Sequence, residues 1–387
     1  MSAPALPTDS ELIAIAEAFH GVGAVLAVEP LGSGNVNATY LVRANAGLSV
    51  LQRINRAVFS QPEQVIRNLE LLGRHVQAKL QAPAPAHPLL QQRRWELPQL
   101  IGALQGDQPW HCCSNGQVWR CISHVAEASS VDVIGSPVQA RELGLGLGLF
   151  HLLISDLEVS QLSDTLEGFH ITPTYLEAYH RALVQTKRTA TAGTEHCMAF
   201  IRDREGITGL LEQAKARGIL PLRPIHGDPK INNVMLDRST GEAVALIDLD
   251  TVKPGLVHYD LGDCLRSGCN RLGEETADWT SVRFDLELAE AILSGYFQVA
   301  GTMLSPAEVM LIPDAARLIS FELGLRFFSD YLAGNTYFRA DHPEHNLQRA
   351  LVQFQLTASI EAQMEPLRAL VQRLSGAVAP ASPQRQA

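Results

Sequence analysis

Three side chains that carry oxygen atoms follow one another in the second half of the chain. Asp228 closes the triplet His226-Gly227-Asp228, Asn233 comes five residues later, and Asp248 follows an apolar run. Phosphoryl transfer needs such a set, because one carboxylate orients a hydroxyl group and accepts its proton while an amide and a second carboxylate hold Mg²⁺ on the phosphates. The order and types of these residues therefore favour a phosphoryl-transfer site.

A β-hairpin would bring these groups together. The apolar runs 233–236 and 243–247 predict two short strands, and residues 237–242 between them include Ser, Thr and Gly, which favour a turn. Asn233 would then lie beside Asp248. Two such oxygen ligands suit Mg²⁺ in a nucleotide site, where the ion has few protein ligands and several phosphate oxygens. Asp228 would lie in the loop before the first strand. The alternative is that each acid is an ordinary surface turn residue, as in many isolated His-Gly-Asp triplets.

The segment resembles the catalytic region of the kinase-like phosphotransferases of the aminoglycoside phosphotransferase and choline kinase group. These proteins have His-Gly-Asp-x-x-x-x-Asn as a catalytic loop, Ile-Asp at the end of a metal-binding strand, and a following Asp-x-x-Asp, here residues 260–263. The resemblance implies a catalytic base (Asp228), metal-side residues (Asn233, Asp248 and the auxiliary acid Asp250) and residues that support the loop (His226 and Asp260).

Further stretches resemble the N-acetylhexosamine 1-kinases, from about residue 10 to about residue 370. Those kinases phosphorylate the anomeric hydroxyl of N-acetylglucosamine and N-acetylgalactosamine, so the resemblance implies ATP and Mg²⁺ as cofactors and a sugar as substrate. It implies that Arg326 and Tyr337 reach the sugar and that Arg266 is a sugar-binding or structural residue. The matching stretches are 50–52, 169–173, 226–233, 247–255, 262–266, 325–338 and 343–349. Independently of the resemblance, the amides of Asn35 and Asn37 in the glycine loop are expected to face phosphate or sugar.

A nucleotide-covering loop is predicted near the N-terminus. Gly32, Ser33, Gly34 and Asn35 lie between two predicted strands, 24–29 and 38–43. Glycine at such a turn lets backbone N–H groups approach phosphates closely. A hairpin turn without a ligand is the alternative, since two glycines in a turn are common.

The third strand, 48–54, lacks the lysine that this superfamily usually has there. Gln52 stands at the expected position, and Arg53 would point to the opposite face unless the register shifts by one residue. Glu70, on the following helix, is the nominal partner of the missing lysine. A hinge over 123–127 would offer Ser123 and Val125 to the nucleotide.

These elements predict an α+β, two-lobed, protein-kinase-like fold. A small antiparallel-sheet N-lobe is expected over 1–124, a larger and mostly helical C-lobe over 125–375, and a disordered tail over 376–387. Helices are expected over 9–20 with Asp9 or Ser10 as cap, over 61–80, 284–301 and 307–332 with a break near Pro313, and as one long helix over 346–374. The Leu-Gly alternation at 143–150 completes no dinucleotide motif, so close helix packing is expected there.

Composition limits the remaining classes. With 46% apolar and 19% charged residues, the 387-residue chain has the composition of a globular enzyme, and its net charge of −10 argues against nucleic-acid binding. The longest apolar run, 143–154, is too short to cross a membrane, and the first ten residues lack the regions of a signal peptide. Six cysteines without a Cys-x-x-Cys pair favour reduced thiols and a cytoplasmic location. The oligomeric state stays open.

Two alternatives remain. The acceptor could be another hydroxyl compound, such as a cell-wall amino sugar, an aminoglycoside, choline or homoserine. Choline sites need an aromatic cage, and only 6% of the residues are aromatic; Arg266 and Arg326 argue against a polycationic aminoglycoside. The absent third-strand lysine also allows a catalytically inactive scaffold that binds nucleotide.

Overall fold

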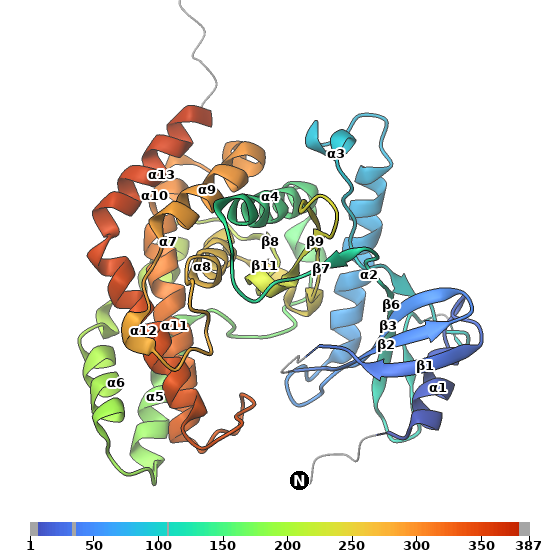
Figure 1. Cartoon of the computed structure of the whole chain (residues 1–387), viewed down its shortest axis with the longest axis horizontal. Helices are drawn as coiled ribbons and strands as arrows, with labels where there is room; N and C mark the ends of the chain where they lie inside the picture. Colours follow the sequence, from blue (N-terminus) through green and yellow to red (C-terminus); the bar gives the residue numbers. More distant parts are fainter. Residues whose placement is uncertain (1–6, 33–35, 107, 379–387) are drawn as a thin grey trace, which may run out of the picture.

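The computed structural model describes residues 7–32, 36–106 and 108–378. Figure 1 shows an N-terminal sheet, in blue, beside a larger group of helices that continues to the red C-terminal helices. This mixed α+β arrangement, with an antiparallel sheet first and helices after it, confirms the predicted fold class. The first sheet is entirely antiparallel, with the order β1 (Val25–Pro30), β2 (Ala38–Ala44), β3 (Gly47–Arg53), β6 (Val118–Ser123) and β4 (Leu100–Ile101), and β5 (His111–Cys112) pairs with β6.

Strand alternation gives this sheet two apolar faces, and each is covered by a helix. Leu51 and Trp119 pack on one face against α1 (Asp9–Glu17), whereas Val118 packs on the other against α2 (Pro62–Leu80). The cap of α1 is Thr8, not Asp9 or Ser10. Thr8 and Glu11 form a capping box, in which each side chain accepts from the other residue's backbone N–H group, and this satisfies two free donors of the first turn.

Two small sheets form the region that was predicted as a hairpin. β9 (Val234–Asp237) and β10 (Ala243–Leu246) pair antiparallel, and β7 (Ala128–Ser129) adds to β9. The turn is held by Asp237, whose Oδ1 accepts from the backbone N–H groups of Ser239 (2.9 Å) and Thr240 (3.0 Å). A second pair, β8 (Arg223–Ile225) with β11 (Lys253–Gly255), lies beside it. The predicted hairpin is therefore confirmed.

Glycines allow the two central helices of the helical lobe to pack closely. A Cβ on Gly144 of α4 (Pro137–Ile154) would lie 1.8 Å from the carbonyl oxygen of Ile292 on α9 (Leu286–Ala300), and one on Gly295 would lie 2.2 Å from that of Arg141. The glycine alternation therefore marks helix packing, as expected. The other helices and 3₁₀ turns are α3 (Leu89–Gln92), η1 (Val159–Gln161), α5 (Thr172–Gln185), α6 (Ala192–Arg202), η2 (Glu205–Ile207), α7 (Leu210–Ala216), η3 (Ile231–Asn233), η4 (Leu249–Thr251), α8 (Val257–Gly268), η5 (Trp279–Ser281), η6 (Gly301–Met303), α10 (Pro306–Met310), α11 (Ile312–Leu332), α12 (His345–Ala362) and α13 (Met364–Val378).

The C-terminal elements differ from the prediction in two places. The expected single helix over 346–374 is wrong, because α12 ends at Ala362 and α13 begins at Met364. Pro366 lies in the first turn of α13. In a continuous helix, proline could not donate a hydrogen bond to the carbonyl oxygen four residues earlier, and its ring would clash with that carbonyl group. The chain therefore forms two helices at this point. The disordered tail was expected to begin at residue 376, but α13 continues to Val378. Residues 379–387 lie outside the described residues. The predicted break before Pro313 is present, between α10 and α11.

None of the helices in the described part of the chain combines the length and the apolar character needed to cross a membrane.

Candidate active site

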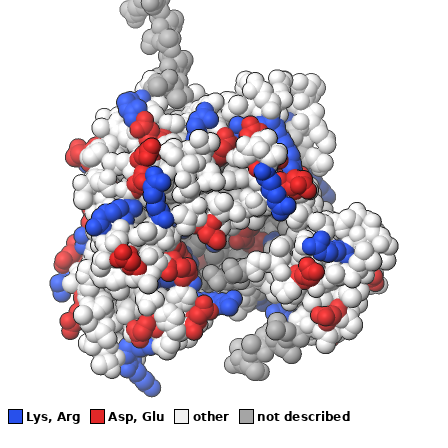
Figure 2. Space-filling model, in the orientation of Figure 1, with Lys and Arg blue, Asp and Glu red and all other residues white. Residues whose placement is uncertain are grey.

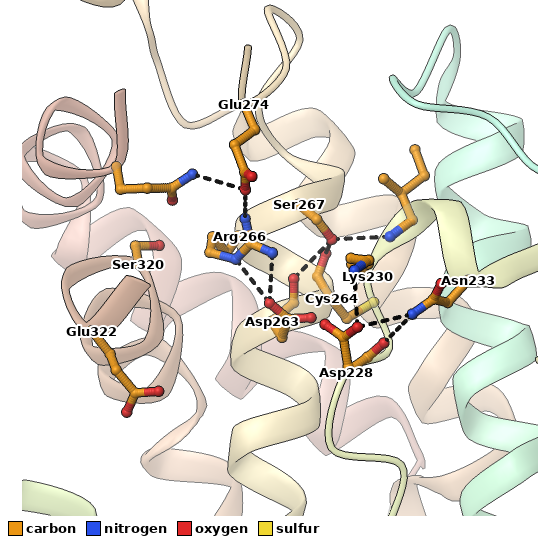
Figure 3. Close-up of polar contacts among 12 residues, drawn as sticks. Asp228, Lys230, Asn233, Asp263, Cys264, Arg266, Ser267, Glu274, Ser320 and Glu322 are labelled. Atoms are coloured by element: carbon orange, nitrogen blue, oxygen red, sulfur yellow. Dashed lines mark hydrogen bonds and ion pairs between the residues drawn. The ribbon is translucent and has the colours of Figure 1, made fainter. Parts of the chain in front are cut away.

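The loop after β8 and the short helix η3 place two polar side chains, Lys230 and Asn233, beside Asp228. The Oδ2 atom of Asp228 accepts from Nζ of Lys230 (2.9 Å) and from Nδ2 of Asn233 (3.2 Å), as Figure 3 shows. The same Nδ2 atom also donates to the backbone oxygen of Asp228 (2.7 Å). No hydrogen-bond partner of Oδ1 is found among the described residues, so this oxygen can accept from a bound hydroxyl group.

The charges near Asp228 keep it ionised. Burial alone raises its pKa, but the charge and hydrogen bond of Lys230, together with the charges of His226 and Arg266, outweigh burial and lower the pKa below the ordinary carboxyl value. In turn, Asp228 raises the pKa of Lys230. A carboxylate that is ionised at neutral pH is ready to accept a proton.

Asp260 holds the catalytic loop from below. Its two carboxylate oxygens accept from the backbone N–H groups of His226 (2.7 Å) and Gly227 (2.8 Å), and His151 contacts one of them at 2.8 Å. Gly227 has a φ of 88°, and a Cβ there would lie 2.6 Å from the carbonyl oxygen of Thr251, so only glycine fits. His226 and Asp260 thus occupy supporting positions, as the resemblance implies.

Asn233 and Asp248 lie side by side at the expected metal position. The backbone N–H group of Ile247 donates to the carbonyl oxygen of Asn233 (2.9 Å), which brings the two ends of the hairpin together. Asp248 has left-handed backbone angles (φ 62°, ψ 55°), and its solvent-accessible carboxylate has no hydrogen-bond partner among the described residues. Desolvation by the surrounding protein, together with the negative charge of Asp250, raises the pKa of Asp248 to about 6.

This donor set fits Mg²⁺. Within the described residues no group of three or more His, Cys, Asp or Glu side chains is arranged to hold a metal ion. An amide oxygen and a free carboxylate are hard donors, and Mg²⁺ bound with a nucleotide takes its remaining ligands from phosphate oxygens and water. A cation would also relieve the repulsion between Asp248 and Asp250.

Asp250 turns toward the N-terminal sheet. One carboxylate oxygen forms an ion pair with Arg120 on β6, and the other accepts from the side-chain amide of Asn37. Asn37 is fixed in turn by Asn55, whose backbone N–H group donates to its Oδ1 at 2.8 Å. The structure therefore places Asn37 beside Asp250, apart from the other predicted sugar-binding residues.

Gln52 lies on the face of β3 that is turned toward Asp250. Its Oε1 accepts from Nε (2.9 Å) and Nη2 (2.7 Å) of Arg120, its partner across the strands. Arg53 lies on the opposite face, 6.0 Å from the ring centre of Trp119. Glu70, the nominal partner of the missing lysine, pairs instead with Arg74 one turn later on α2 (2.6 Å).

The hinge and glycine loop are described in part. Gly32 has a φ of 72°, whereas Ser33, Gly34 and Asn35 lie outside the described residues. Ser123 is fully engaged, since its N–H group donates to the carbonyl oxygen of Gln99 and its hydroxyl accepts from the N–H group of Gln99, both at 2.9 Å. Val125 is buried beside β10 and stays the hinge residue predicted to meet the nucleotide.

A pocket of about 370 Å³ is lined in part by Phe169, the neighbour of His170, and His170 contacts the carbonyl oxygen of Gly227 in the catalytic loop. Arg326 also lines the pocket, with its guanidinium carbon 5.1 Å from the ring of Phe169, 5.0 Å from Tyr175 and 5.3 Å from Phe338. No ion pair or hydrogen bond of Arg326 occurs within the described residues. Tyr337, at 51% exposure, forms part of the rim. Arg326 and Tyr337 thus share one pocket.

Arg266 lies near Asp228, but each of its three guanidinium nitrogens contacts a carboxylate other than that of Asp228. It donates from Nε and Nη2 to Oδ1 of Asp263 (2.8 and 2.7 Å), and Nη1 contacts Glu274 (3.1 Å; Figure 3). These contacts tie the loop after α8 to the helix, so the structure favours the structural alternative for Arg266. Asp330, one turn after Arg326 on α11, does not pair with it; Asp330 accepts from backbone N–H groups, among them those of Tyr337 (2.8 Å) and Phe338 (3.0 Å).

Sequence reasoning gave no role to four residues of this region. Lys230 lies inside the catalytic motif, and Arg120 alternates with the apolar residues Trp119 and Cys121 of the segment that forms β6, so both have a signal in the sequence. Tyr175 left none. His170 belonged to a recognised stretch: its Nε2 lies 2.7 Å from the carbonyl oxygen of Gly227 and its Nδ1 lies 2.9 Å from Glu322.

Comparisons with known proteins agree with this geometry. The model of the phosphotransferase enzyme family matches residues 27–300. Similar solved structures include an aminoglycoside phosphotransferase from Alicyclobacillus acidocaldarius (16% identity, 98% of both chains covered, TM-score 0.56) and a choline kinase from Cryptosporidium parvum (12% identity, 96% of this chain and 100% of that chain, TM-score 0.59). A spectinomycin phosphotransferase solved with ADP and spectinomycin is also similar (12% identity, 97% and 99%, TM-score 0.53). At these identities the structures support the kinase-like fold.

Proposed function

The chain belongs to the phosphotransferase enzyme family, and from this premise we propose that it uses ATP to phosphorylate the anomeric hydroxyl of an N-acetylhexosamine. The products are ADP and the sugar 1-phosphate. The observation that carries the choice of acceptor is the position of Arg326, whose guanidinium group lies among the aromatic rings of the pocket. The resemblance of residues 325–338 to N-acetylhexosamine 1-kinases supports the same choice.

The pocket chemistry favours a neutral acceptor. Phe169, Tyr175 and Phe338 form the kind of aromatic cluster that binds an ammonium group in choline-type sites. Here Arg326, held about 5 Å from each ring, occupies that position and repels a second cation. A sugar fits better, because its apolar ring face packs on aromatic rings while Arg326 donates hydrogen bonds to a hydroxyl or N-acetyl oxygen.

Asp228 is the proposed base. Its free Oδ1 accepts a hydrogen bond from the anomeric hydroxyl and orients that oxygen toward the terminal phosphorus atom of ATP. As the new O–P bond forms, the bond to the bridging oxygen of ADP breaks and the hydroxyl proton passes to Asp228. The lowered pKa of Asp228 makes it a weak base, so the proton moves late, and an anomeric hydroxyl is more acidic than an ordinary alcohol. Assistance of this type contributes roughly 10²–10⁴-fold in rate.

The neighbours of Asp228 complete the proposed site. Asn233 and Asp248 would hold Mg²⁺, with Asp250 behind them. When bound with ATP, Mg²⁺ neutralises the charge that develops on the phosphate oxygens. Lys230 keeps the carboxylate of Asp228 ionised and in place through its 2.9 Å contact. Val125 in the hinge and the turn at Gly32 in the N-terminal lobe are the proposed nucleotide contacts.

The test is a panel of acceptors with MgATP, followed by phosphorus NMR of the products. The panel contains N-acetylglucosamine, N-acetylgalactosamine, a cell-wall amino sugar, an aminoglycoside, choline and homoserine. The expected result is turnover of an N-acetylhexosamine and a phosphorus signal coupled to the anomeric proton. Turnover of choline or an aminoglycoside alone would reject the acceptor, and ATP binding without turnover of any acceptor would favour an inactive scaffold.

A further inference from the structure

The missing third-strand lysine leaves the phosphate region without its usual cation, and Arg120 of β6 lies where that charge is needed. Arg120 is 1% exposed and pairs across the strands with Gln52, the residue at the lysine position. Its Nη2 forms an ion pair with Asp250, two residues after the proposed metal ligand Asp248. Arg120 therefore reaches the metal side of the site from the neighbouring strand.

The guanidinium group of Arg120 is held firmly at one edge. Nε and Nη2 both donate to Oε1 of Gln52, at 2.9 and 2.7 Å. The amide of Gln52 is itself oriented by Thr39, whose hydroxyl accepts from its Nε2 at 3.2 Å. Three strands, β2, β3 and β6, thus fix this cation in one orientation, and a fixed planar guanidinium is well suited to bind phosphate oxygens.

One end of the group lacks a partner. Nη1 of Arg120 is buried and has no hydrogen-bond partner within the described residues. The two terminal nitrogens of a guanidinium lie side by side, so Nη1 is presented at the same end as Nη2, the end that meets Asp250. A buried charged donor without an acceptor is costly, and at this place, beside Asp250 and the lysine position of β3, a phosphate oxygen would supply the acceptor.

We propose that Arg120 is a nucleotide-phosphate-binding residue that takes the place of the absent third-strand lysine, with Gln52 as its support. The inference rests on the proposed function in so far as ATP is the ligand. It explains why residue 52 is a neutral amide: a lysine there would place a second positive charge within hydrogen-bonding distance of Arg120, whereas glutamine supplies the acceptor that Arg120 uses.

Arg120 could instead serve only to tie Asp250 to the N-terminal sheet. That role predicts a general loss of structure and of all ligand binding when the arginine is removed. A phosphate-binding role predicts a loss that grows with the number of phosphates on the ligand. The two are separated by the ratio of affinities for ATP and for adenosine.

The experiment is titration calorimetry of adenosine, ADP and ATP, each with Mg²⁺, on the wild type, Arg120→Met and Arg120→Lys. Arg120→Met is expected to change the Kd of adenosine less than twofold and to weaken ATP by about 10- to 100-fold, the range of a charged hydrogen bond. Arg120→Lys should recover part of that loss. Arg43→Met is the control, because it removes the same charge from the same sheet at a half-exposed position on β2, where Arg43 pairs only with Glu29 among the described residues, and it should leave the ratio unchanged.

Arg120→Met also leaves Asp250 buried without its cation, so a second variant tests the idea if that protein does not fold. The exchange Gln52→Lys with Arg120→Gln keeps one cation and one amide between the strands and should keep ATP within about tenfold of the wild-type affinity. Equal losses of adenosine and ATP, or an unchanged ratio in Arg120→Met, would overturn the proposal. If the wild type bound no nucleotide, the proposed function would be rejected as well. If only the proposed sugar acceptor were wrong, the ratio of ATP to adenosine affinity would stay the same.

Discussion

The two carboxylate oxygens of Asp228 have different surroundings and, in the proposed mechanism, different roles. One carboxylate oxygen is held by Lys230 and Asn233, and the other has no partner within the described residues. The bound oxygen fixes the side chain, while the free oxygen can accept a proton. Losing the negative charge should therefore affect the chemical step far more than the structure.

The variant Asp228→Asn tests this division. We expect kcat to fall by about 10²- to 10⁴-fold, because the amide cannot accept the proton, while the Kd of MgATP and the melting temperature stay near those of the wild type. Steady-state kinetics and calorimetry measure both. Asp203→Asn, on an exposed helix end, is the control. Turnover like that of the wild type in Asp228→Asn would exclude it as the base.

The residue scale also includes the acceptor pocket. Arg326→Met keeps the length and apolar stem of the side chain but removes the cation from the three rings. We expect KM for the sugar to rise by roughly 10-fold, the loss of one charged hydrogen bond, with KM for ATP unchanged. Initial-rate kinetics with each substrate varied separately check this. Arg181→Met, 66% exposed on α5, is the control; equal changes in both KM values would argue against a pocket role for Arg326.

At the scale of elements, the crossing of α4 and α9 supports the catalytic region. Gly144→Ala would push a methyl group into the carbonyl oxygen of Ile292, 1.8 Å away, so backbone must move. We expect the free energy of unfolding to fall by about 3 kcal/mol, measured by urea denaturation. Gly376→Ala on α13 is the matched control, since a Cβ there meets nothing within 4 Å and alanine favours a helix. An unchanged stability in Gly144→Ala would contradict this packing.

A second element-level link joins α5, α11 and the catalytic loop through His170. Its two ring nitrogens face the carbonyl oxygen of Gly227 and the carboxylate of Glu322. Both partners accept hydrogen bonds, so the ring must carry two protons. Burial lowers its pKa, but the charge and hydrogen bond of Glu322, with Gly227 and Asp263, raise it above the ordinary histidine value; Tyr259 stacks on the ring at 5.2 Å.

This imidazolium predicts a pH-dependent stability. A pKa raised in the folded state means that the contribution is fully present below the unfolded pKa of about 6.5 and is lost as pH rises through the folded value. We expect the difference in unfolding free energy between the wild type and His170→Gln to be constant below about pH 6 and to shrink on the alkaline side. Urea denaturation from acid to alkaline pH measures it, with His180→Gln, 50% exposed, as control. A difference independent of pH would mean that the ring is neutral.

At the scale of the whole molecule, the two lobes meet at the metal side of the site. Figure 2 shows this face hollowed between them, with acidic side chains around the hollow. Asp250 belongs to the C-terminal part of the chain, yet Asn37 and Arg120 of the N-terminal sheet bind its carboxylate. A ligand that binds between the lobes should therefore stabilise the whole molecule.

The variant Asp248→Ala tests that coupling. MgATP at a hundredfold excess over its Kd should stabilise the wild type by about 2.7 kcal/mol, seen as a higher melting temperature. We expect Asp248→Ala to lose the Mg²⁺-dependent part of this shift, because the free carboxylate is the proposed ligand. Asp132→Ala, an exposed position, should keep it. If ATP raised the melting temperature of Asp248→Ala as much as that of the wild type, and Mg²⁺ contributed equally in both proteins, Asp248 would not be a metal ligand.

The sequence by itself determined the elements and the catalytic loop. The hairpin, the third strand and α2 follow from periodicity and turn residues within short segments, and the motif around Asp228 binds its own members: Asn233 and Lys230 lie within five residues. Local spacing is enough in these cases, because backbone geometry places such neighbours together. Pro366, in the first turn of α13, is a local signal of the same kind for the end of α12.

Only the tertiary structure decided which charges meet across the molecule. Arg120 and Asp250 are 130 residues apart, and neither strand alternation nor spacing says that they pair. In the same way, the rings around Arg326 come from two segments of the chain, 169–175 and the residues after α11. Glu70 pairs with Arg74 on its own helix, although the helix itself follows from the sequence. A buried charge takes whichever partner the packing of lobes brings within reach, and that packing depends on the contacts of the entire chain.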